Sequence, residues 1–320
     1  MSFWATERAA HHGTPASVLA QAYVKDDLPD TWTMNDVAAM DSNELLEFAV
    51  SKTDYGEAMR PTFEYLLRIA SVRLVLRDDK CNIVATAVGV PLTLSTPHGP
   101  QELLLSTMLT LRAIDWGSGL AQRFMRRTFA YTASKGYTTR LFTGTKVLQA
   151  ATLSPHHTCR RVFPWMQQYK PDALFVHGVV TPRAAMQWTA FLAEYGPKWG
   201  PILSVDMLTH PSLFACVLQT AQGKWEHAGV FVRMGKDHVH MLYYGCTTEQ
   251  RLLKFLRSVS AVEKRSVIVD LFHEKLASSN VLVEESLPSI VLPHSSYTWY
   301  AHNLPDVCVN SVPLVGLPML

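Results

Sequence analysis

Residues 102–134 read ELLLSTMLTLRAIDWGSGLAQRFMRRTFAYTAS. The first ten positions, 102–111, are almost continuously apolar, which predicts a largely buried β-strand. Gly117, Ser118 and Gly119 supply a turn. From Leu120 to Ser134 apolar side chains recur at helical spacing, with the arginines on the other side, so we expect an amphipathic helix ending near Gly136. Residues 138–143 (TTRLFT) look like the strand that follows this helix.

The second half of the chain repeats this order. Residues 239–245 (VHMLYYG) predict a strand, and 247–250 (TTEQ) have the spacing of a capping box. Five apolar residues then share one helical face: Leu252, Phe255, Leu256, Val259 and Val262. Residues 266–272 (SVIVDLF) predict the strand that follows this helix. A hairpin-like pair precedes each unit, at 72–76 with 83–94 and at 214–219 with 229–234.

This repeated order predicts the fold class. We expect an α/β (α+β) protein of two halves related by pseudo-two-fold symmetry, each with a mixed central sheet flanked by helices. The Pro-rich stretch 163–182 is the expected connector, which places the halves at 1–165 and 166–320. Two unrelated α/β domains are the alternative, because periodicity alone does not separate these options.

Composition places the chain among globular proteins. Its 320 residues are 48% hydrophobic and 18% charged, enough for one large core or two moderate ones. The formal net charge of +2 argues against broad nucleic-acid binding, which usually shows as a basic surface. No apolar run is long enough to span a bilayer, and residues 1–10 lack the apolar core of a signal peptide. We therefore expect a cytoplasmic protein that is not transmembrane.

Cysteine and histidine positions predict no metal site. The five cysteines, at 81, 159, 216, 246 and 308, lack CxxC spacing, which favours free thiols over disulfides or a standard zinc site. His156, His157 and Cys159 match no common zinc pattern. His238 and His240 alternate on one face of a strand without an evident third ligand, so we expect a satisfied or exposed pair.

Short segments along the chain resemble the N-myristoyltransferase family. The family motifs are FWxT, LPxGFTW, PEFLL, SAIP, EINFL, ALDL, YNW and an apolar terminus of the VGLVL type. The matching segments follow in the same order: FWAT at 3–6, LPDTWT at 28–33, FEYLL at 63–67, VGVP at 88–91, ELLLS at 102–106, VDL at 269–271, Asn303, and VGLPML at 315–320. Each match is weak, and their shared order from residue 3 to residue 320 is the specific signal.

The resemblance implies a monomeric fold of two GNAT-like halves. The first would hold acyl-CoA and the second would form a peptide groove. The implied reaction moves a myristoyl group from myristoyl-CoA, a co-substrate, to the N-terminal glycine amine of protein substrates, with no permanently bound cofactor. GNAT enzymes hold pyrophosphate at a strand, small-residue turn and helix, where backbone N–H groups face the anion. An ordinary strand-to-helix turn is the alternative for residues 117–119.

The resemblance also implies catalytic residues. The base would be the C-terminal carboxylate of Leu320; the uncharged stretch 312–320 favours its burial, and a solvated terminus is the alternative. Backbone N–H groups of Leu105 and Ser106 would stabilise the oxyanion, unless the strand is regular and its donors are paired. Thr143 would position the acceptor amine, although a β-branched residue also suits a strand.

Acyl-CoA contacts are implied at three places. Phe3 and Trp4 match a segment along the adenine end, and Ser106, Thr107 and Met108 continue the oxyanion strand. A basic family loop is replaced by six residues: Arg112, Ala113, Ile114, Asp115, Trp116 and Gly117. Asp115 has the wrong charge for a pyrophosphate neighbour. The acidic run that suits basic peptides is also reduced to Asp54 and Glu57, which predicts a weaker preference for basic peptides.

Two rival functions remain open at the level of sequence. A catalytically silent relative would bind acyl chains or peptides without turnover, and the altered loop is its main support. A GNAT acetyltransferase would use acetyl-CoA and would need no long apolar tunnel. Turnover with myristoyl-CoA, acetyl-CoA or neither distinguishes the three.

Overall fold

Each half contains the predicted order of a hairpin, a strand, a helix and a further strand. The computed structural model describes residues 28–52, 56–95, 99–115, 119–144, 154–171, 175–195, 200–202, 205–219, 221–222, 225–245, 249–271, 279–288 and 296–302. The elements up to the expected connector are β1 (Thr33–Asp36), η1 (Ala39–Asp41), α3 (Asn43–Lys52), η2 (Gly56–Met59), α4 (Arg60–Ile69), β2 (Val72–Arg77), β3 (Ile83–Ser95), β4 (Gln101–Leu111), η3 (Ala113–Asp115), α5 (Leu120–Ser134), β5 (Arg140–Gly144) and β6 (Ser154–Phe163).

The second half contains the same core order with additions. Its elements are β7 (Phe175–Val179), α6 (Pro182–Tyr195), β8 (Gly200–Ile202), α7 (Val205–Leu208), β9 (Leu213–Gln219), β10 (Trp225–Met234), β11 (His238–Gly245), α8 (Glu249–Glu263), β12 (Ser266–Leu271), α10 (Asn280–Glu284), β13 (Leu287–Pro288) and β14 (Ser296–His302). The predicted helix 120–134 is confirmed, and the predicted strand 102–111 lies within β4. The expected connector is not all irregular, because it includes β7, which pairs with β9. Val262 was expected in the core but is 40% exposed.

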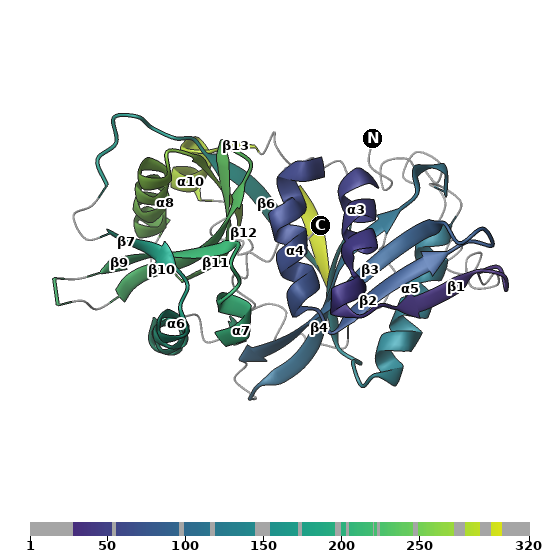
Figure 1. The fold of residues 1–320 in the computed structure, drawn as a ribbon. Coiled ribbons are helices and arrows are strands. Elements are labelled where there is room, and N and C mark those ends of the chain that lie inside the picture. The colour runs from purple at the N-terminus through teal and green to yellow at the C-terminus, as the bar shows by residue number, and fades with distance from the viewer. Residues whose placement is uncertain are drawn as a thin grey trace.

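Strand pairing joins the two halves into one hydrogen-bonded path. Its order is β1-β2-β3-β4-β5-β14-β6-β12-β11-β10-β9-β7. The pairs β4–β5 and β11–β12 are parallel, and each is connected through a helix, α5 or α8. Strands also pair across the boundary between the halves: β6 pairs with β12, β14 lies between β5 and β6, and β8 pairs with β3. The predicted mixed α/β architecture of two related halves is confirmed (Figure 1).

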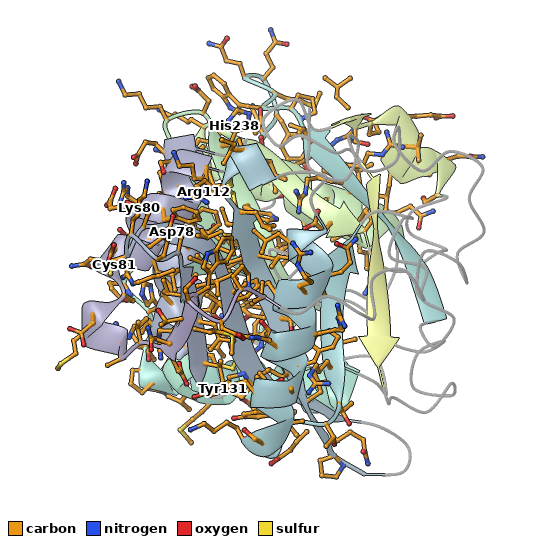
Figure 2. All side chains as sticks on the ribbon, turned by 90° about the vertical axis from the view of Figure 1, so that its right-hand side faces the viewer. Asp78, Lys80, Cys81, Arg112, Tyr131 and His238 are labelled. Atoms are coloured by element: carbon orange, nitrogen blue, oxygen red, sulfur yellow. The ribbon has the colours of Figure 1, made fainter. Side chains whose placement is uncertain are left out.

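Helices cover both faces of the first half. α3 and α4 share a core with β2, β3 and β4, while α5 packs on the opposite face through Leu120, Ala121 and Phe124. Tyr131 of α5, labelled in Figure 2, donates a hydrogen bond to Asp36 at 2.8 Å and so ties the helix to β1. These apolar faces stabilise the layers because each buried large side chain contributes about 1.5–3 kcal/mol.

Two buried arginines cap the ends of these helices. Arg73 donates to the carbonyl oxygens of Leu67 and Ala70 at 2.7 and 2.6 Å, where α4 ends. Arg140 donates to the carbonyl oxygens of Phe129 and Tyr137 at 2.7 and 2.9 Å, just after α5. Carbonyl groups in the last turn of a helix lack intrahelical partners, and cations there also suit the helix dipole. The strands that follow each helix are thereby fixed to its end.

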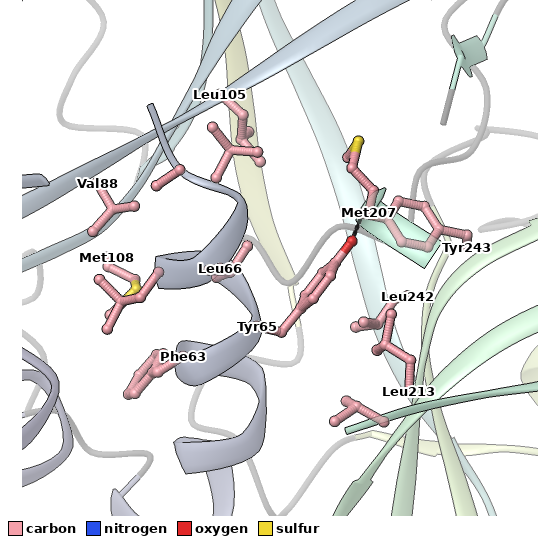
Figure 3. Close-up of a cluster of buried hydrophobic side chains, with 14 of the residues drawn as sticks. Phe63, Tyr65, Leu66, Val88, Leu105, Met108, Met207, Leu213, Leu242 and Tyr243 are labelled. Carbon is pink, nitrogen blue, oxygen red and sulfur yellow. Dashed lines mark hydrogen bonds between the residues drawn. The ribbon is translucent and has the colours of Figure 1, made fainter. Parts of the chain in front are cut away.

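Helix α4 lies between the two halves (Figure 1). Its side chains Phe63 and Leu66 face the strands of the first half, toward Leu105 and Met108. Tyr65 points the other way, toward Tyr243 of β11 (Figure 3). The largest core cluster therefore contains residues from both halves. The other face of the second half is covered by α8, through Leu252, Phe255, Leu256 and Val259.

Candidate functional site

The parallel strands β4 and β5 separate after a short paired stretch. They form three residue pairs, which end at Ser106 with Phe142. Within the described residues, β4 then continues against β3, and β5 continues against β14, with Thr143 opposite Trp299. Backbone groups that face such a split lose their ladder partner on that side and can bind a ligand. The carboxyl ends of parallel strands are also where α/β folds usually bind ligands.

A β-bulge in β4 lies directly beyond the split. Pairing with β3 shifts between Thr86 and Val88, so that Met108 and Leu109 both lie opposite Ala87. Met108 has a φ of 51°, which is costly for a residue other than glycine. Its side chain is nevertheless buried in the core beside α4 (Figure 3). Bulges and strained residues cluster at functional sites because they redirect backbone groups.

The predicted oxyanion residues lie just before this bulge. Leu105 is opposite Val90 on one side and Leu141 on the other, and Ser106 is opposite Gly89 and Phe142. Both therefore occupy regular ladder positions, and the irregularity begins two residues later. The Oγ atom of Ser106 is buried and has no hydrogen-bond partner among the residues that the structure describes. Thr107 and Met108, expected to contact acyl-CoA, are buried.

The loop between β4 and α5 follows the bulge. Arg112 donates its backbone N–H to Val84 at 2.9 Å, and its guanidinium Nη1 donates to Asp78 Oδ2 at 2.8 Å. Ala113 and Ile114 are exposed, and Asp115 completes η3. Gly119 has a φ of 76°, and the first turn of α5 contains no acidic side chain. Gly119 at the N-cap position has no side chain that could accept from the first turn, and a helix start of this kind is suited to an anion.

Several expected site residues lie outside the described residues. These are Phe3, Trp4, Trp116, Gly117, Asn303 and Leu320. Thr143 is within β5, where its backbone is described as the partner of Trp299. Four expected site residues therefore lie on β4 where it separates from β5: Leu105, Ser106, Thr107 and Met108. Arg112 follows the last residue of β4.

The second half has a similar split and bulge. β11 and β12 form four parallel pairs ending at Met241 with Val269, and the pairing of β11 with β10 then shifts at Leu242. Asp270 follows the last parallel pair. It accepts two hydrogen bonds from Arg160, at 2.6 and 3.0 Å, and its Oδ2 lies 3.4 Å from His240 Nε2. All three side chains are buried.

The contacts among Arg160, His240 and Asp270 determine which of these buried side chains are charged. Burial alone would raise the pKa of Asp270, but the charge and hydrogen bonds of Arg160, together with the neighbouring His240, hold this pKa well below its usual range. Burial lowers the pKa of His240 despite the neighbouring carboxylate. Sequence reasoning treated Asp270 only as part of a motif. The available signal was a single carboxylate inside the apolar strand 266–272.

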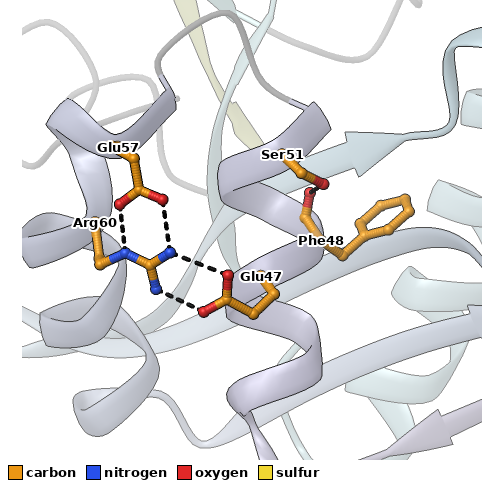
Figure 4. Close-up of polar contacts among 5 residues, drawn as sticks. All are labelled: Glu47, Phe48, Ser51, Glu57 and Arg60. Carbon is orange, nitrogen blue, oxygen red and sulfur yellow. Dashed lines mark hydrogen bonds and ion pairs between the residues drawn. The ribbon is translucent and has the colours of Figure 1, made fainter.

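The acidic side chains near α4 are occupied by one arginine. Arg60 binds Glu57 through Nε and Nη2, at 2.6 and 2.8 Å, and binds Glu47 through Nη1 and Nη2, at 2.7 and 3.0 Å (Figure 4). These hydrogen bonds lower the pKa values of both carboxyl groups. Because all three side chains are at the surface, the stability gained is small. Arg60 therefore compensates part of the negative charge of Glu47 and Glu57.

The described part of the chain contains free thiols and no cluster of metal-binding side chains. Cys81 and Cys216 are free thiols. Within the part of the chain that the structure describes, no group of three or more His, Cys, Asp or Glu residues could hold a metal ion. No described helix combines the length and apolar character needed to cross a membrane.

The fold is similar to that of solved N-myristoyltransferases. A Saccharomyces cerevisiae N-myristoyltransferase with bound myristoyl-CoA and inhibitors aligns with a TM-score of 0.67 and 12% identity, over 94% of this chain and 90% of that chain. A second structure of that enzyme, with bound myristoyl-CoA, aligns with a TM-score of 0.64 and 12% identity, over 92% of both chains. Comparison of the amino-acid sequence with protein-family models and with curated proteins gives no match.

A bacterial protein shares part of this likeness. A conserved protein of unknown function from Enterococcus faecalis V583, described as a probable N-acyltransferase, aligns with a TM-score of 0.50 and 9% identity, over 84% of this chain and 72% of that chain. The predicted N-myristoyltransferase-like fold is therefore confirmed. At these identities the likeness establishes the fold alone.

Proposed function

We propose that this protein transfers a myristoyl group from myristoyl-CoA to the N-terminal glycine amine of protein substrates. The observation that carries the proposal is the β4–β5 split with its bulge at Met108, in a fold that matches structures with bound myristoyl-CoA. Residues 1–165 would hold acyl-CoA and residues 166–320 would form most of the peptide groove. The protein would work in the cytoplasm as a monomer without a permanent cofactor.

The chemistry requires a free amine and a stabilised oxyanion. The amine nitrogen attacks the thioester carbonyl carbon, the carbon–sulfur bond breaks, and the proton lost by the amine passes through a base to the departing CoA sulfur. An α-amino group has a pKa of about 7.7–8.0, so a carboxylate with raised proton affinity is a sufficient base. We assign this role to the carboxylate of Leu320, and the positioning of the amine to Thr143.

Backbone N–H groups beside the split are the proposed oxyanion donors. The resemblance points to Leu105 and Ser106, where β4 has a neighbouring strand on each side. The first positions outside a regular ladder are Met108 and Leu109. We therefore propose that the donors come from Ser106 to Leu109, next to the split. Donors fixed by a strained strand need no reorganisation when charge develops on the thioester oxygen.

The anion-binding part of the proposal rests on backbone groups. The start of α5, with Gly119 at its N-cap position, would face the CoA phosphates, and the surrounding loop keeps Arg112 but has Ile114 and Asp115 where the family has basic residues. This loop also supports the second candidate function. A catalytically silent relative that binds acyl-CoA or peptide is favoured by exposed Ile114 and by Asp115 near a phosphate site.

An activity assay separates these functions. Purified protein is mixed with a Gly-initiated peptide and either myristoyl-CoA or acetyl-CoA, and CoA release and peptide mass are measured. We expect transfer from myristoyl-CoA alone, and none to a matched peptide whose amine is acetylated. Binding of myristoyl-CoA without transfer would support the silent relative, and transfer from acetyl-CoA would support an acetyltransferase.

A reversible extension tests the assigned base. A cleavable tag placed after Leu320 moves the free carboxylate away from its proposed position. We expect the tagged protein to bind myristoyl-CoA without transferring it, and cleavage back to Leu320 to restore transfer. Full activity in the tagged protein would remove Leu320 from the mechanism.

A further inference from the structure

The backbone of Ser106 faces the strand that leaves β4 at the split. The carbonyl oxygen of Gly89, which is opposite Ser106 on β3, accepts a hydrogen bond from the Ser71 N–H at 2.9 Å, on the β2 side. The N–H and C=O groups of one strand residue point the same way, so the Gly89–Ser106 pair exchanges no hydrogen bonds. Leu104, two residues before Ser106, donates its N–H to the Thr139 carbonyl at 2.9 Å, on the β5 side. Ser106 therefore directs its backbone groups toward β5, and it is the last residue of β4 with a partner there.

The hydroxyl group of Ser106 is unpaired because of its neighbours. Its Oγ atom is buried and makes no hydrogen bond with any described residue. The residues directly opposite on the two neighbouring strands are Gly89 and Phe142, and neither residue type has a hydrogen-bonding side chain. A Cβ atom added to Gly89 would lie 2.8 Å from Leu104 Cδ2, so an apolar side chain covers this glycine. Buried hydroxyl groups are nearly always hydrogen-bonded, so the one of Ser106 is available to a bound molecule.

Ser106 is also more accessible than the residues around it. Leu105 lies in the core beside α4 (Figure 3), and alternation along the strand turns the Ser106 side chain to the other face of the sheet. Between Leu103 and Met108 it is the one residue of β4 that is partly exposed. Rotation about its Cα–Cβ bond, among the staggered rotamers, points the hydroxyl in different directions. A ligand at the split can therefore meet this hydroxyl group.

The chemistry open to this hydroxyl group is hydrogen-bond donation. A serine nucleophile needs a neighbouring base that takes its proton. No described side chain is hydrogen-bonded to Ser106 Oγ, so no described base is in place. A neutral hydroxyl keeps its proton and can donate it in a hydrogen bond to a carbonyl oxygen. The EINFL motif that residues 102–106 resemble ends in leucine, so the hydroxyl of Ser106 is a donor that the motif itself lacks.

We propose that the Ser106 hydroxyl is a catalytic hydrogen-bond donor, which binds the thioester carbonyl oxygen of myristoyl-CoA. This inference rests on the proposed function, and it adds a side-chain donor to the backbone donors between Ser106 and Leu109. When the amine nitrogen attacks the carbonyl carbon, negative charge develops on this oxygen and the hydrogen bond from Oγ strengthens. When the carbon–sulfur bond breaks, the charge leaves with the CoA sulfur and Ser106 is unchanged.

Two variants separate the hydroxyl group from the rest of the site. Ser106→Ala removes Oγ and keeps the backbone N–H. Thr62→Val is the matched control, because Oγ1 of Thr62 on α4 is likewise buried without a described partner. We expect Ser106→Ala to lower kcat by about tenfold to a hundredfold, while KM for peptide and the dissociation constant of myristoyl-CoA change by less than about twofold. Thr62→Val should leave all three values unchanged, and urea unfolding shows whether each variant is folded.

Two unreactive analogues of myristoyl-CoA test the hydrogen bond without turnover. One is a ketone with a methylene group between the CoA sulfur and the carbonyl, and the other is the thioether that lacks the carbonyl oxygen. We expect the wild type to bind the ketone more tightly, as measured by calorimetry, and Ser106→Ala to reduce this preference by about threefold to tenfold. Thr62→Val should keep the preference of the wild type.

Other results overturn the assignment. If Ser106→Ala is folded and keeps either the wild-type kcat or the full preference for the ketone, its hydroxyl does not bind the carbonyl oxygen in catalysis. If the variant loses affinity for both analogues equally, Ser106 shapes the binding site without contacting this oxygen. If the wild type prefers the ketone through Ser106 but transfers nothing to a Gly-initiated peptide, the proposed function is wrong and only the ligand contact stands. If the wild type binds neither analogue, both proposals are wrong.

Discussion

The hydroxyl groups of Tyr65 and Tyr243 lie 2.6 Å apart and form a buried hydrogen bond between α4 and β11. Tyr65 belongs to the first half and Tyr243 follows the bulge of the second (Figure 3). His210 packs edge-on against the Tyr65 ring, with centroids 5.4 Å apart. Burial raises the pKa of both tyrosines, so the pair is neutral. This contact fixes how the two halves meet beside α4.

Each single replacement of Tyr65 or Tyr243 by Phe is expected to lower the free energy of unfolding by more than half of the loss in the double variant. Tyr65→Phe or Tyr243→Phe leaves the other hydroxyl buried without its partner, which costs about 1–3 kcal/mol. In the double variant two apolar groups meet and neither hydroxyl remains. Urea unfolding of the four proteins measures the coupling. Strictly additive losses would show that the two hydroxyls do not stabilise each other.

The Arg160–Asp270 pair is expected to be the most sensitive ion pair described in the structure. Arg160→Met leaves Asp270 charged, fully buried and without its main partner, which should lower the free energy of unfolding by about 3–5 kcal/mol. Arg60→Gln is the surface control, and its loss should stay below about 1 kcal/mol. Equal losses in the two variants, measured by urea unfolding, would contradict a special role for burial.

Stability should fall as the pH drops from about 7 toward 4, partly because of His210. Burial and the positive charge of Arg68 lower the pKa of His210 from 6.5 to about 4. Below pH 6.5 His210 therefore binds a proton in the unfolded chain but stays neutral in the folded protein. The resulting loss of unfolding free energy ends near pH 4, where the folded protein binds the proton too. Between pH 7 and 5 this amounts to roughly 1–2 kcal/mol.

A single variant isolates this contribution. His210 Nδ1 accepts a hydrogen bond from the Ser212 backbone N–H at 3.1 Å, and the Asn side chain can supply an acceptor at the same place. His210→Asn should lose less stability than the wild type between pH 7 and 5, as followed by urea midpoints. An identical pH dependence in both proteins would show that His210 is not the group responsible.

Reversing the charge at Asp115 should improve acyl-CoA binding. Asp115 ends η3, before the expected phosphate-binding turn, where a negative charge repels phosphate. Asp115→Arg is expected to tighten myristoyl-CoA binding by a few-fold and to make it more salt-sensitive. Calorimetry at two salt concentrations measures both effects. Unchanged affinity would mean that this loop does not approach the phosphates.

Local elements were predictable because their signals lie within short windows of sequence. The helix α5 was predicted to the residue, since its apolar spacing, Gly119 and Gly136 mark both ends. The strand β4 was predicted from its apolar run, but its bulge at Met108 was not. A residue with positive φ that is not glycine leaves no mark in composition, because the surrounding packing imposes it.

The candidate site was only partly predictable. The positions of Leu105, Ser106, Thr107 and Met108 on one strand followed from the segment itself. The partner of Arg112 did not, because Asp78 is 34 residues away and meets it only when the β2–β3 turn folds against the end of β4. The same holds for Arg160 and Asp270, which are 110 residues apart.

The sequence by itself determined the order of strands and helices, the repeat of that order and the family likeness that the fold then confirmed, because periodicity and turn residues act over a few positions. Only the tertiary structure decided that β6 and β14 pair across the boundary between the halves, that β4 and β5 part at Ser106, and which buried charges pair. Strand pairing and ion pairing join residues far apart in the chain, and the gain from burying them together depends on the whole core.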